Sequence, residues 1–263
     1  MDLGIKNKVA LVTAASRGLG KAVALQLSRE GAKVAICSRS EAAVQRAKDE
    51  IAQLTGGPVL ALVADVTKKD HIETLVERVA AEFGSVDILI TNAGGPAAGL
   101  AADFTPDDYR AAVELNLLST ITLIYAGLPL MMKKRWGRVI AITSVAARQP
   151  IAQLILSNTA RAGVLGFMKT LSAQVAKDGI TVNSVCPGYT KTERIEELAA
   201  MFARSGKGTA EDFYRNIEVE VPLGRMGTPE EFANAVAFLA SARASYITGV
   251  ALPIDGGYIK GLY

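Results

Sequence analysis

The segment from residue 8 to residue 20 constrains the fold most, because an apolar run leads directly into a turn that is rich in glycine. After Gly20 the apolar side chains recur at helical spacing, so the turn joins the carboxyl end of a strand to the amino end of a helix. The first turn of a helix carries unpaired N–H groups, and Gly18 and Gly20 allow a ligand to approach the backbone closely. The segment therefore predicts either an anion site that suits a pyrophosphate or an ordinary turn that binds nothing.

Seven apolar runs alternate with helical patterns along the chain. They span residues 9–13, 33–38, 59–64, 86–91, 139–143, 181–186 and 250–254. The runs are continuous rather than alternating, which is typical of parallel strands covered on both faces. No linker interrupts the regular spacing. We therefore expect one domain over residues 1–263: a doubly wound α/β fold of Rossmann type, with a seven-stranded parallel sheet and helices on both faces.

Residues 190–222 form a polar and amphipathic insertion between the sixth strand and the last helix. Its apolar side chains Ile195, Leu198, Ala199 and Phe202 fall on one helical face. Ligands of an open doubly wound sheet lie outside the carboxyl ends of the strands. The insertion therefore predicts a helical lid over a substrate, with a helix pair that merely packs on the body as the alternative.

Composition excludes several classes of partner and site. The formal net charge of +3 is too small to indicate nucleic acid. The two cysteines, Cys37 and Cys186, end predicted buried strands, so we expect free thiols and no metal site. The weakly polar stretch 117–132 falls short of the roughly 18 apolar residues that a membrane helix needs. We expect a cytoplasmic protein that acts on a small molecule, with no nucleic-acid or membrane partner.

The residues after the second predicted strand indicate which dinucleotide the turn would hold. Folds that prefer NAD place an acidic residue about twenty residues after the glycine turn, where it binds the ribose 2′-hydroxyl. Here Ser38 and Arg39 occupy that region, and Arg17 lies within the turn. Guanidinium groups suit a 2′-phosphate through charge-assisted hydrogen bonds. The sequence therefore favours NADP(H) over NAD(H).

A series of motifs follows in a fixed order. The segment from Thr13 to Gly20 matches TGxxxGxG apart from Ala14, and it is followed by Asp65-Val66, Asn92-Ala93-Gly94-Gly95, Pro187-Gly188 with Thr192, Tyr246-Ile-Thr-Gly249 and Asp255-Gly-Gly257. Over essentially its whole length the chain resembles the classical short-chain dehydrogenase/reductase family, and it looks most similar to the 3-oxoacyl-[acyl carrier protein] reductases.

The resemblance implies a cofactor site and an assembly. The residues implied to contact the cofactor are Thr13, Ala15, Ser16, Arg17, Gly18, Leu19, Gly20, Ser38, Arg39, Asp65, Val66, Asn92, Ala93, Gly94, Arg161, Pro187, Gly188, Thr190 and Thr192. Ala14 replaces the first glycine of the turn, at a cost of about 1 kcal/mol if φ is positive there. A homotetramer packed through helices that begin near Pro106 and Ser157 is implied, although a dimer also fits.

The residues implied to carry the chemistry are only partly present. Ser144 and Asn116 stand where the family has its carbonyl-binding serine and its helix-kinking asparagine. The tyrosine and lysine of the YxxxK pair are replaced by Ser157 and Arg161, which still share one helix face. An aliphatic hydroxyl is a far weaker acid than a phenol, and a guanidinium does not release its proton near neutral pH.

Three hypotheses follow from this replacement. Tyr189 could supply the missing acid, Arg161 could bind a carboxylate or stabilise an enolate, or the site could be idle. The first two make the protein an NADP(H)-dependent reductase, with non-standard acid and base residues, of a 3-oxoacyl-thioester-like or other apolar ketone. The third makes it a catalytically idle NADP(H)-binding module that acts as a sensor or binds a partner.

Overall fold

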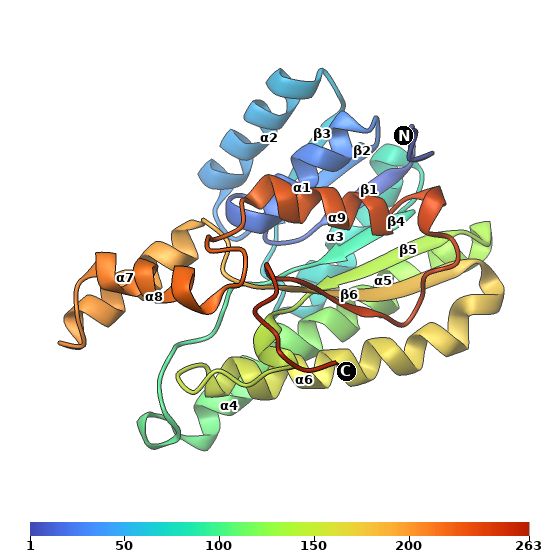
Figure 1. Ribbon diagram of the computed structural model, residues 1–263. Helices are drawn as coiled ribbons and strands as arrows, with labels where there is room; N and C mark the ends of the chain where they lie inside the picture. Colours follow the sequence, from blue (N-terminus) through green and yellow to red (C-terminus); the bar gives the residue numbers. More distant parts are fainter. Residues whose placement is uncertain (263) are drawn as a thin grey trace.

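A computed structural model describes residues 1–262 of the protein, and its centre is a single parallel sheet (Figure 1). The strands are β1 (Val9–Val12), β2 (Lys33–Ser38), β3 (Val59–Val63), β4 (Ile88–Thr91), β5 (Gly137–Ile142), β6 (Ile180–Pro187) and β7 (Ala251–Ile254). Their order is β3-β2-β1-β4-β5-β6-β7, and every neighbouring pair is parallel. The predicted seven-stranded parallel sheet is confirmed.

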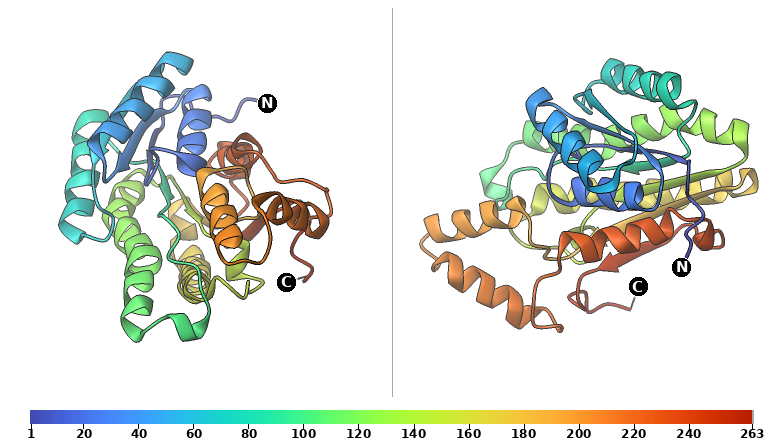
Figure 2. Two further views of the ribbon diagram at one scale, coloured as in Figure 1. Left: turned by 90° about the vertical axis from the view of Figure 1, so that its left-hand side faces the viewer. Right: turned by 90° about the horizontal axis from the view of Figure 1, so that it is seen from above.

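Helices cover both faces of this sheet (Figure 2). They are α1 (Gly18–Arg29), α2 (Glu41–Thr55), α3 (Lys69–Phe83), α4 (Pro106–Val113), α5 (Ser119–Lys134), α6 (Ile155–Val175), α7 (Glu193–Arg204), α8 (Ala210–Glu220) and α9 (Pro229–Leu239). Strand residues such as Val12 and Ile36 pack with α1, α2 and α9, whereas Leu11 and Ala35 pack with α3, α5 and α6. Burial on both faces explains why the strands are continuous apolar runs.

Helices α4 and α5 are joined by a π-helical turn, Glu114–Leu118, so that residues 106–134 run as one distorted helix. This run of 29 residues is longer than the stretch considered from the sequence, and by length and composition alone it could cross a membrane. Its side chains Leu123, Ile124 and Met131 are instead buried against the sheet. Core packing therefore accounts for part of the apolar character of the run, although Leu118, Tyr125 and Met132 remain exposed.

The crossover direction reverses between β1 and β4, which are neighbours in the sheet. In such folds a crevice forms outside the carboxyl ends of the strands at this point. Helices α7 and α8, orange in Figure 1, project beyond the body on this side. They share a small apolar cluster around Ile195, Ile217 and Val221. The predicted helical insertion after the sixth strand is confirmed, and it lies where the crevice is expected.

Candidate functional site

The turn between β1 and α1 is built to hold an anion. Helix α1 begins at Gly18, and the side chain of Arg17 before it makes no capping hydrogen bond. The first N–H groups of the helix therefore lack a side-chain acceptor. A Cβ atom on Gly20 would lie 2.7 Å from the carbonyl oxygen of Ala14 and 2.8 Å from Nδ2 of Asn92, so glycine is required there.

Hydrogen bonds between Thr13 and Asn92 fix this turn to the loop after β4. Thr13 Oγ1 donates to the carbonyl oxygen of Asn92 at 2.7 Å and accepts from its N–H at 2.8 Å. Asn92 Nδ2 in turn faces the carbonyl oxygens of Thr13 at 3.3 Å and Ala14 at 3.2 Å. These hydrogen bonds hold the turn in place, so both residues affect binding even without touching a ligand.

Ala14 adopts a left-handed backbone conformation, with φ of 47°. Glycine, which the TGxxxGxG pattern has at this position, tolerates such a conformation without strain. A side chain with a Cβ atom is disfavoured there by about 1 kcal/mol. The strain expected from the sequence is therefore present at the edge of the candidate anion site.

A cavity of about 620 Å³ extends from this turn across the carboxyl ends of the strands. Its walls include most of the predicted site residues: Ser16, Arg17, Gly18, Leu19, Ser38, Arg39, Asp65, Val66, Asn92, Ala93, Gly94, Ser144, Ser157, Arg161, Pro187, Gly188, Tyr189, Thr190 and Thr192. Thr13, Ala15, Gly20 and Asn116 are not in the wall. They lie behind it and shape it.

Two of the arginines that line the cavity are Arg39, near Asp65, and Arg17, in the turn before α1. The carboxylate of Asp65 accepts the N–H and hydroxyl of Thr67 at 3.0 and 2.8 Å. These hydrogen bonds lower the pKa of Asp65, and the charge of Arg39 adds to the effect. Arg17 lies 3.4 Å from Glu197 of α7. The cations of Arg17 and Arg39 fit a dinucleotide that carries an additional phosphate.

Ser144 lines the cavity, and Asn116 lies outside its wall. Ser144 caps a short 3-10 turn, Val145–Ala147, and its Oγ accepts the N–H of Ala146 at 3.1 Å. Asn116 is 4% exposed, and its Nδ2 donates to the carbonyl oxygen of Gly94 at 3.1 Å. It lies in the π-helical turn between α4 and α5, so the helix is distorted where the sequence placed a kink. Asn116 Oδ1 is buried and has no partner within residues 1–262.

Ser157 and Arg161 lie one turn apart on α6, and both are 7% exposed. Arg161 Nη1 donates to the carbonyl oxygens of Ile142 at 3.1 Å and Thr143 at 2.8 Å, at the end of β5. Burial lowers the pKa of Arg161 to about 10, with a further contribution from the charge of Arg194. The guanidinium is therefore still protonated near neutral pH.

Tyr189 lines the cavity but is poorly suited to act as the missing acid. Its ring packs edge-on against Tyr258, with ring centroids 5.3 Å apart, within the apolar cluster beside the lid. Burial raises the pKa of Tyr189 well above that of an ordinary phenol, and Tyr258 adds to the shift. A phenol with a raised pKa is a weaker proton donor. The structure therefore does not favour the hypothesis that Tyr189 supplies the missing acid.

Two charged residues of α7 were missed from the sequence. Arg194 Nη2 donates to the carbonyl oxygen of Pro96 at 3.0 Å, and Arg194 Nη1 lies 3.4 Å from Glu197. Glu197 also faces Arg17. These contacts join the lid to the loops after β1 and β4. The only sequence signal was that both residues follow Thr192 on the polar face of the predicted lid.

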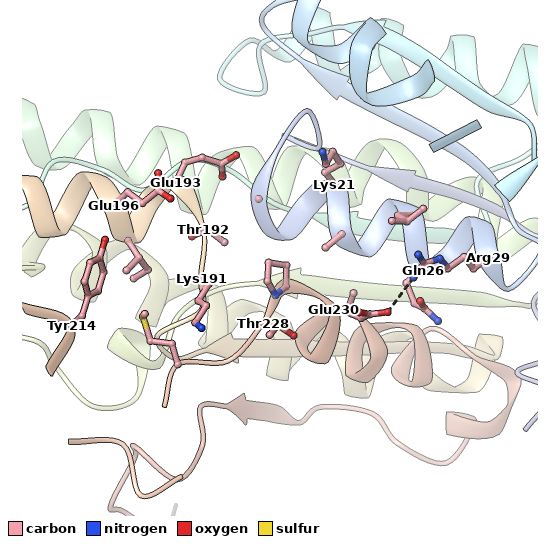
Figure 3. Close-up of a pocket in the computed structure, with 17 residues that line it drawn as sticks. Lys21, Gln26, Arg29, Lys191, Thr192, Glu193, Glu196, Tyr214, Thr228 and Glu230 are labelled. Atoms are coloured by element: carbon pink, nitrogen blue, oxygen red, sulfur yellow. Dashed lines mark hydrogen bonds and ion pairs between the residues drawn. The ribbon is translucent and has the colours of Figure 1, made fainter. Parts of the chain in front are cut away.

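A second cavity, of about 730 Å³, lies on the other side of residues 191–195, between α1, α9 and the lid (Figure 3). Arg29 and Glu230 at its far end form an ion pair of 3.2 Å. Lys21, at the α1 side, is paired with Glu50. Lys21 and Arg29 are therefore each paired with an acid, whereas Ser144, Ser157 and Arg161 line the other cavity.

Comparison with known proteins agrees with this geometry. The family model described as enoyl-(acyl carrier protein) reductase matches residues 13–259. The 3-oxoacyl-[acyl-carrier-protein] reductase FabG of Escherichia coli K12 is 40% identical over 255 residues, which cover 97% of this chain and 98% of that protein.

Solved structures of reductases have the same fold. L-sorbose reductase from Gluconobacter frateurii, complexed with NADPH and L-sorbose, superposes with a TM-score of 0.94 at 32% identity and covers all of both chains. An actinorhodin polyketide ketoreductase with NADPH has a TM-score of 0.92 at 32% identity, covering 97% of this chain and 98% of the other. Motif order, sheet topology and these matches together show that the chain belongs to the short-chain dehydrogenase/reductase family and is close to its 3-oxoacyl-[acyl-carrier-protein] reductases.

Proposed function

We propose that the protein is an NADP(H)-dependent oxidoreductase that reduces the carbonyl group of a 3-oxoacyl-thioester-like or other apolar ketone. The observation that carries this proposal is the single 620 Å³ cavity, which joins the anion-binding turn, Arg17 and Arg39 to Ser144. The NADPH complexes of the sorbose reductase and the ketoreductase support the choice of cofactor.

The residues of the cavity fit NADP(H) from end to end. The turn and the amino end of α1 would hold the pyrophosphate, and Arg17 and Arg39 would hold the 2′-phosphate. Asp65 and Val66 would contact the adenine, while Gly188, Thr190 and Thr192 would line the nicotinamide. When bound, NADPH supplies a hydride.

Ser144 is arranged to bind the carbonyl oxygen of a substrate. Because its Oγ already accepts the N–H of Ala146, its hydroxyl hydrogen remains free to be donated. The new C–H bond forms as the π electrons of the C=O bond move onto this oxygen, which then takes a proton from water. Ser157 and Arg161 supply a second hydroxyl and a positive charge beside the developing negative charge. Ile195 and Leu198 of the lid would cover the apolar part of the substrate.

The alternative is an idle NADP(H)-binding module that senses the dinucleotide or binds a partner. The replacement of both YxxxK residues by Ser157 and Arg161 favours it, because a missing general acid typically costs about 10²- to 10⁴-fold in rate. We place it second, since Ser144 and Asn116 keep their positions in the structure.

The decisive experiment follows NADPH absorbance against ketones, β-ketoacyl thioesters and quinones. Reduction that is lost in Ser144→Ala would support the reductase. If the parent is inactive on every compound while Ser157→Tyr with Arg161→Lys is active, the idle module is favoured. A parent activity lost only in Tyr189→Phe would reinstate Tyr189 as the acid, against the argument from its burial.

We also propose that the protein is cytoplasmic and forms a homotetramer through α4, α5 and α6. Leu118, Tyr125 and Met132 expose apolar surface in the run of residues 106–134, which supports a covered face. Light scattering after size exclusion would distinguish a tetramer from a dimer.

A further inference from the structure

Arg161 is a buried cation for which the protein supplies no counter-ion. No carboxylate of residues 1–262 forms an ion pair with it, although ten other ion pairs are present. Burial has the largest effect on its pKa, and the charged side chain that contributes most is another cation, Arg194. A buried charge without a counter-ion is costly unless acceptors around it use its donors, so the donors that Arg161 has left are what matter.

The free donors of Arg161 have a specific shape. Nη1 is engaged by the carbonyl oxygens of Ile142 and Thr143. The remaining donors, Nε and Nη2, make no hydrogen bond to residues 1–262 and belong to a side chain that lines the 620 Å³ cavity. Together Nε and Nη2 form one edge of the guanidinium, the edge that binds both oxygens of a carboxylate.

The three carboxylates that line the cavity, those of Asp65, Glu193 and Glu197, do not pair with Arg161. Asp65 is bound by Thr67 and lies at the other end of the cavity, beside Arg39. Glu197 pairs with Arg17 and Arg194. Glu193 lies at the glycine turn, with Oε2 3.7 Å from the position of a Cβ on Gly18. None of them reaches Arg161.

The cofactor does not supply the missing charge either. Its phosphates suit the turn, the amino end of α1, Arg17 and Arg39, whereas its nicotinamide end carries no negative charge. The contact with the cofactor that the resemblance implies for Arg161 would be made to uncharged ribose hydroxyls, so an anion bound by Arg161 would belong to the substrate.

We propose, on the basis of the reductase activity proposed above, that the ketone substrate carries a carboxylate, which makes it an oxo acid rather than a neutral ketone, and that Nε and Nη2 of Arg161 bind this carboxylate. Ser157, one turn away on the same face of α6, lies beside this carboxylate. Ser144 binds the ketone oxygen, and the alkyl part lies under Ile195 and Leu198. Arg161 therefore selects the substrate through its charge, in a position where the family pattern has a lysine.

The test measures binding rather than turnover. Protein saturated with NADP⁺ is titrated calorimetrically with α-oxooctanoate and γ-oxooctanoate, each compared with its methyl ester. At least one acid is expected to bind about tenfold or more tightly than its ester, since a charge-assisted pair contributes about 1.5–3 kcal/mol. Arg161→Met should remove this difference, and Arg161→Lys should retain part of it.

Arg148→Met is the matched control. Arg148 is also partly buried and donates to a backbone carbonyl, that of Ala251, but it does not line the cavity. Its replacement should leave the preference for the acid unchanged, with folding of each variant checked by thermal melting. An ester that binds as tightly as its acid, the absence of binding by both acids, or an unchanged preference in a folded Arg161→Met variant would each overturn the inference.

The two proposals fail in different ways. If an acid binds through Arg161 but no compound is reduced by NADPH, the anion site stands and the reductase does not. If neutral ketones or thioesters are reduced while the acids neither bind nor compete, the reductase stands and the oxo-acid assignment is wrong.

Discussion

The two ends of β5 each lie beside a buried arginine, and the protein treats these two cations differently. At the amino end, Arg138 is 3% exposed and donates to the carbonyl oxygens of Ser241 at 3.0 Å and Gly137 at 2.8 Å. Its guanidinium also lies 4.5 Å from the ring centroid of Trp136. At the carboxyl end, Arg161 uses one nitrogen for the backbone and keeps one edge free.

Other residues at the two ends of the sheet differ in the same way: those at the amino end have hydrogen-bond partners, whereas some at the carboxyl end do not. Asp87 at the amino end is 2% exposed, but it accepts from the Val9 N–H at 2.9 Å and from Lys134 Nζ at 2.8 Å. The carboxyl end instead contains the left-handed Ala14 and the unpartnered Asn116 Oδ1. Polar groups at one end stabilise the fold, whereas strain and unused polar groups collect where a ligand is expected.

The largest expected effect is a loss of activity from a substitution at the carboxyl end of the sheet. Ser144→Ala removes the hydroxyl that is free to bind a carbonyl oxygen, so kcat/KM for ketone reduction should fall about 10²- to 10³-fold. The free energy of unfolding should fall by no more than about 1 kcal/mol, the usual cost of a lost cap. Steady-state kinetics and denaturant unfolding measure both. An unchanged rate would remove Ser144 from the proposed mechanism.

Arg138→Met should show the opposite pattern. It leaves buried carbonyl oxygens without a donor, so the free energy of unfolding should fall by about 2–3 kcal/mol. NADPH affinity of the folded fraction should not change, because Arg138 does not line the cavity. Arg215→Met, at a side chain that is 75% exposed, is the control and should change stability by less than about 0.5 kcal/mol. Equal losses in the two variants would contradict the assignment of a structural role to Arg138.

A smaller effect is expected at the far end of the cavity. Arg39→Ala should weaken NADPH binding about tenfold and leave NADH binding nearly unchanged, since only the former has a 2′-phosphate. Arg17→Ala should have a smaller effect, because Arg17 is also held by Glu197. Calorimetric titration of the parent and each variant with NADPH and with NADH measures the ratio of the two dissociation constants. Tighter binding of NADH than NADPH by the parent would refute the assignment of both arginines.

The smallest effect concerns backbone strain. Ala14→Gly should raise the free energy of unfolding by up to about 1 kcal/mol, because glycine tolerates a positive φ. Ala15→Gly, at the next residue, should lower it by about 0.5–1 kcal/mol, since Ala15 is buried and is not among the residues with positive φ. Thermal unfolding of the pair should therefore shift in opposite directions. Shifts of the same sign would show that the turn is not strained at Ala14.

Local patterns in the sequence were sufficient for most of the fold. The apolar runs predicted the strands because both faces of each strand are buried, and the amphipathic pattern after residue 190 predicted the helices of the lid. The position of Ala14 in its motif indicated the left-handed turn that the structure contains.

The electrostatics of the site could not be predicted in the same way. Whether Arg161 meets a carboxylate depends on side chains from several elements that are distant in sequence. The same holds for Arg194 and Glu197, whose partners Pro96 and Arg17 lie far away along the chain. The raised pKa of Tyr189 likewise results from burial, with a contribution from Tyr258, which lies near the carboxyl end of the sequence.

The contact between Arg17 and Glu197 links two binding events. If a bound 2′-phosphate drew Arg17 away from Glu197, helix α7 would lose this ion pair, and the ion pair would in turn oppose that movement. By thermodynamic reciprocity, cofactor and substrate must then change each other's affinity by the same factor. Because the pair is exposed, its contribution is about 0–1 kcal/mol, so this coupling is limited to about fivefold. Loss of this ion pair on cofactor binding would therefore change the affinity for substrate only slightly.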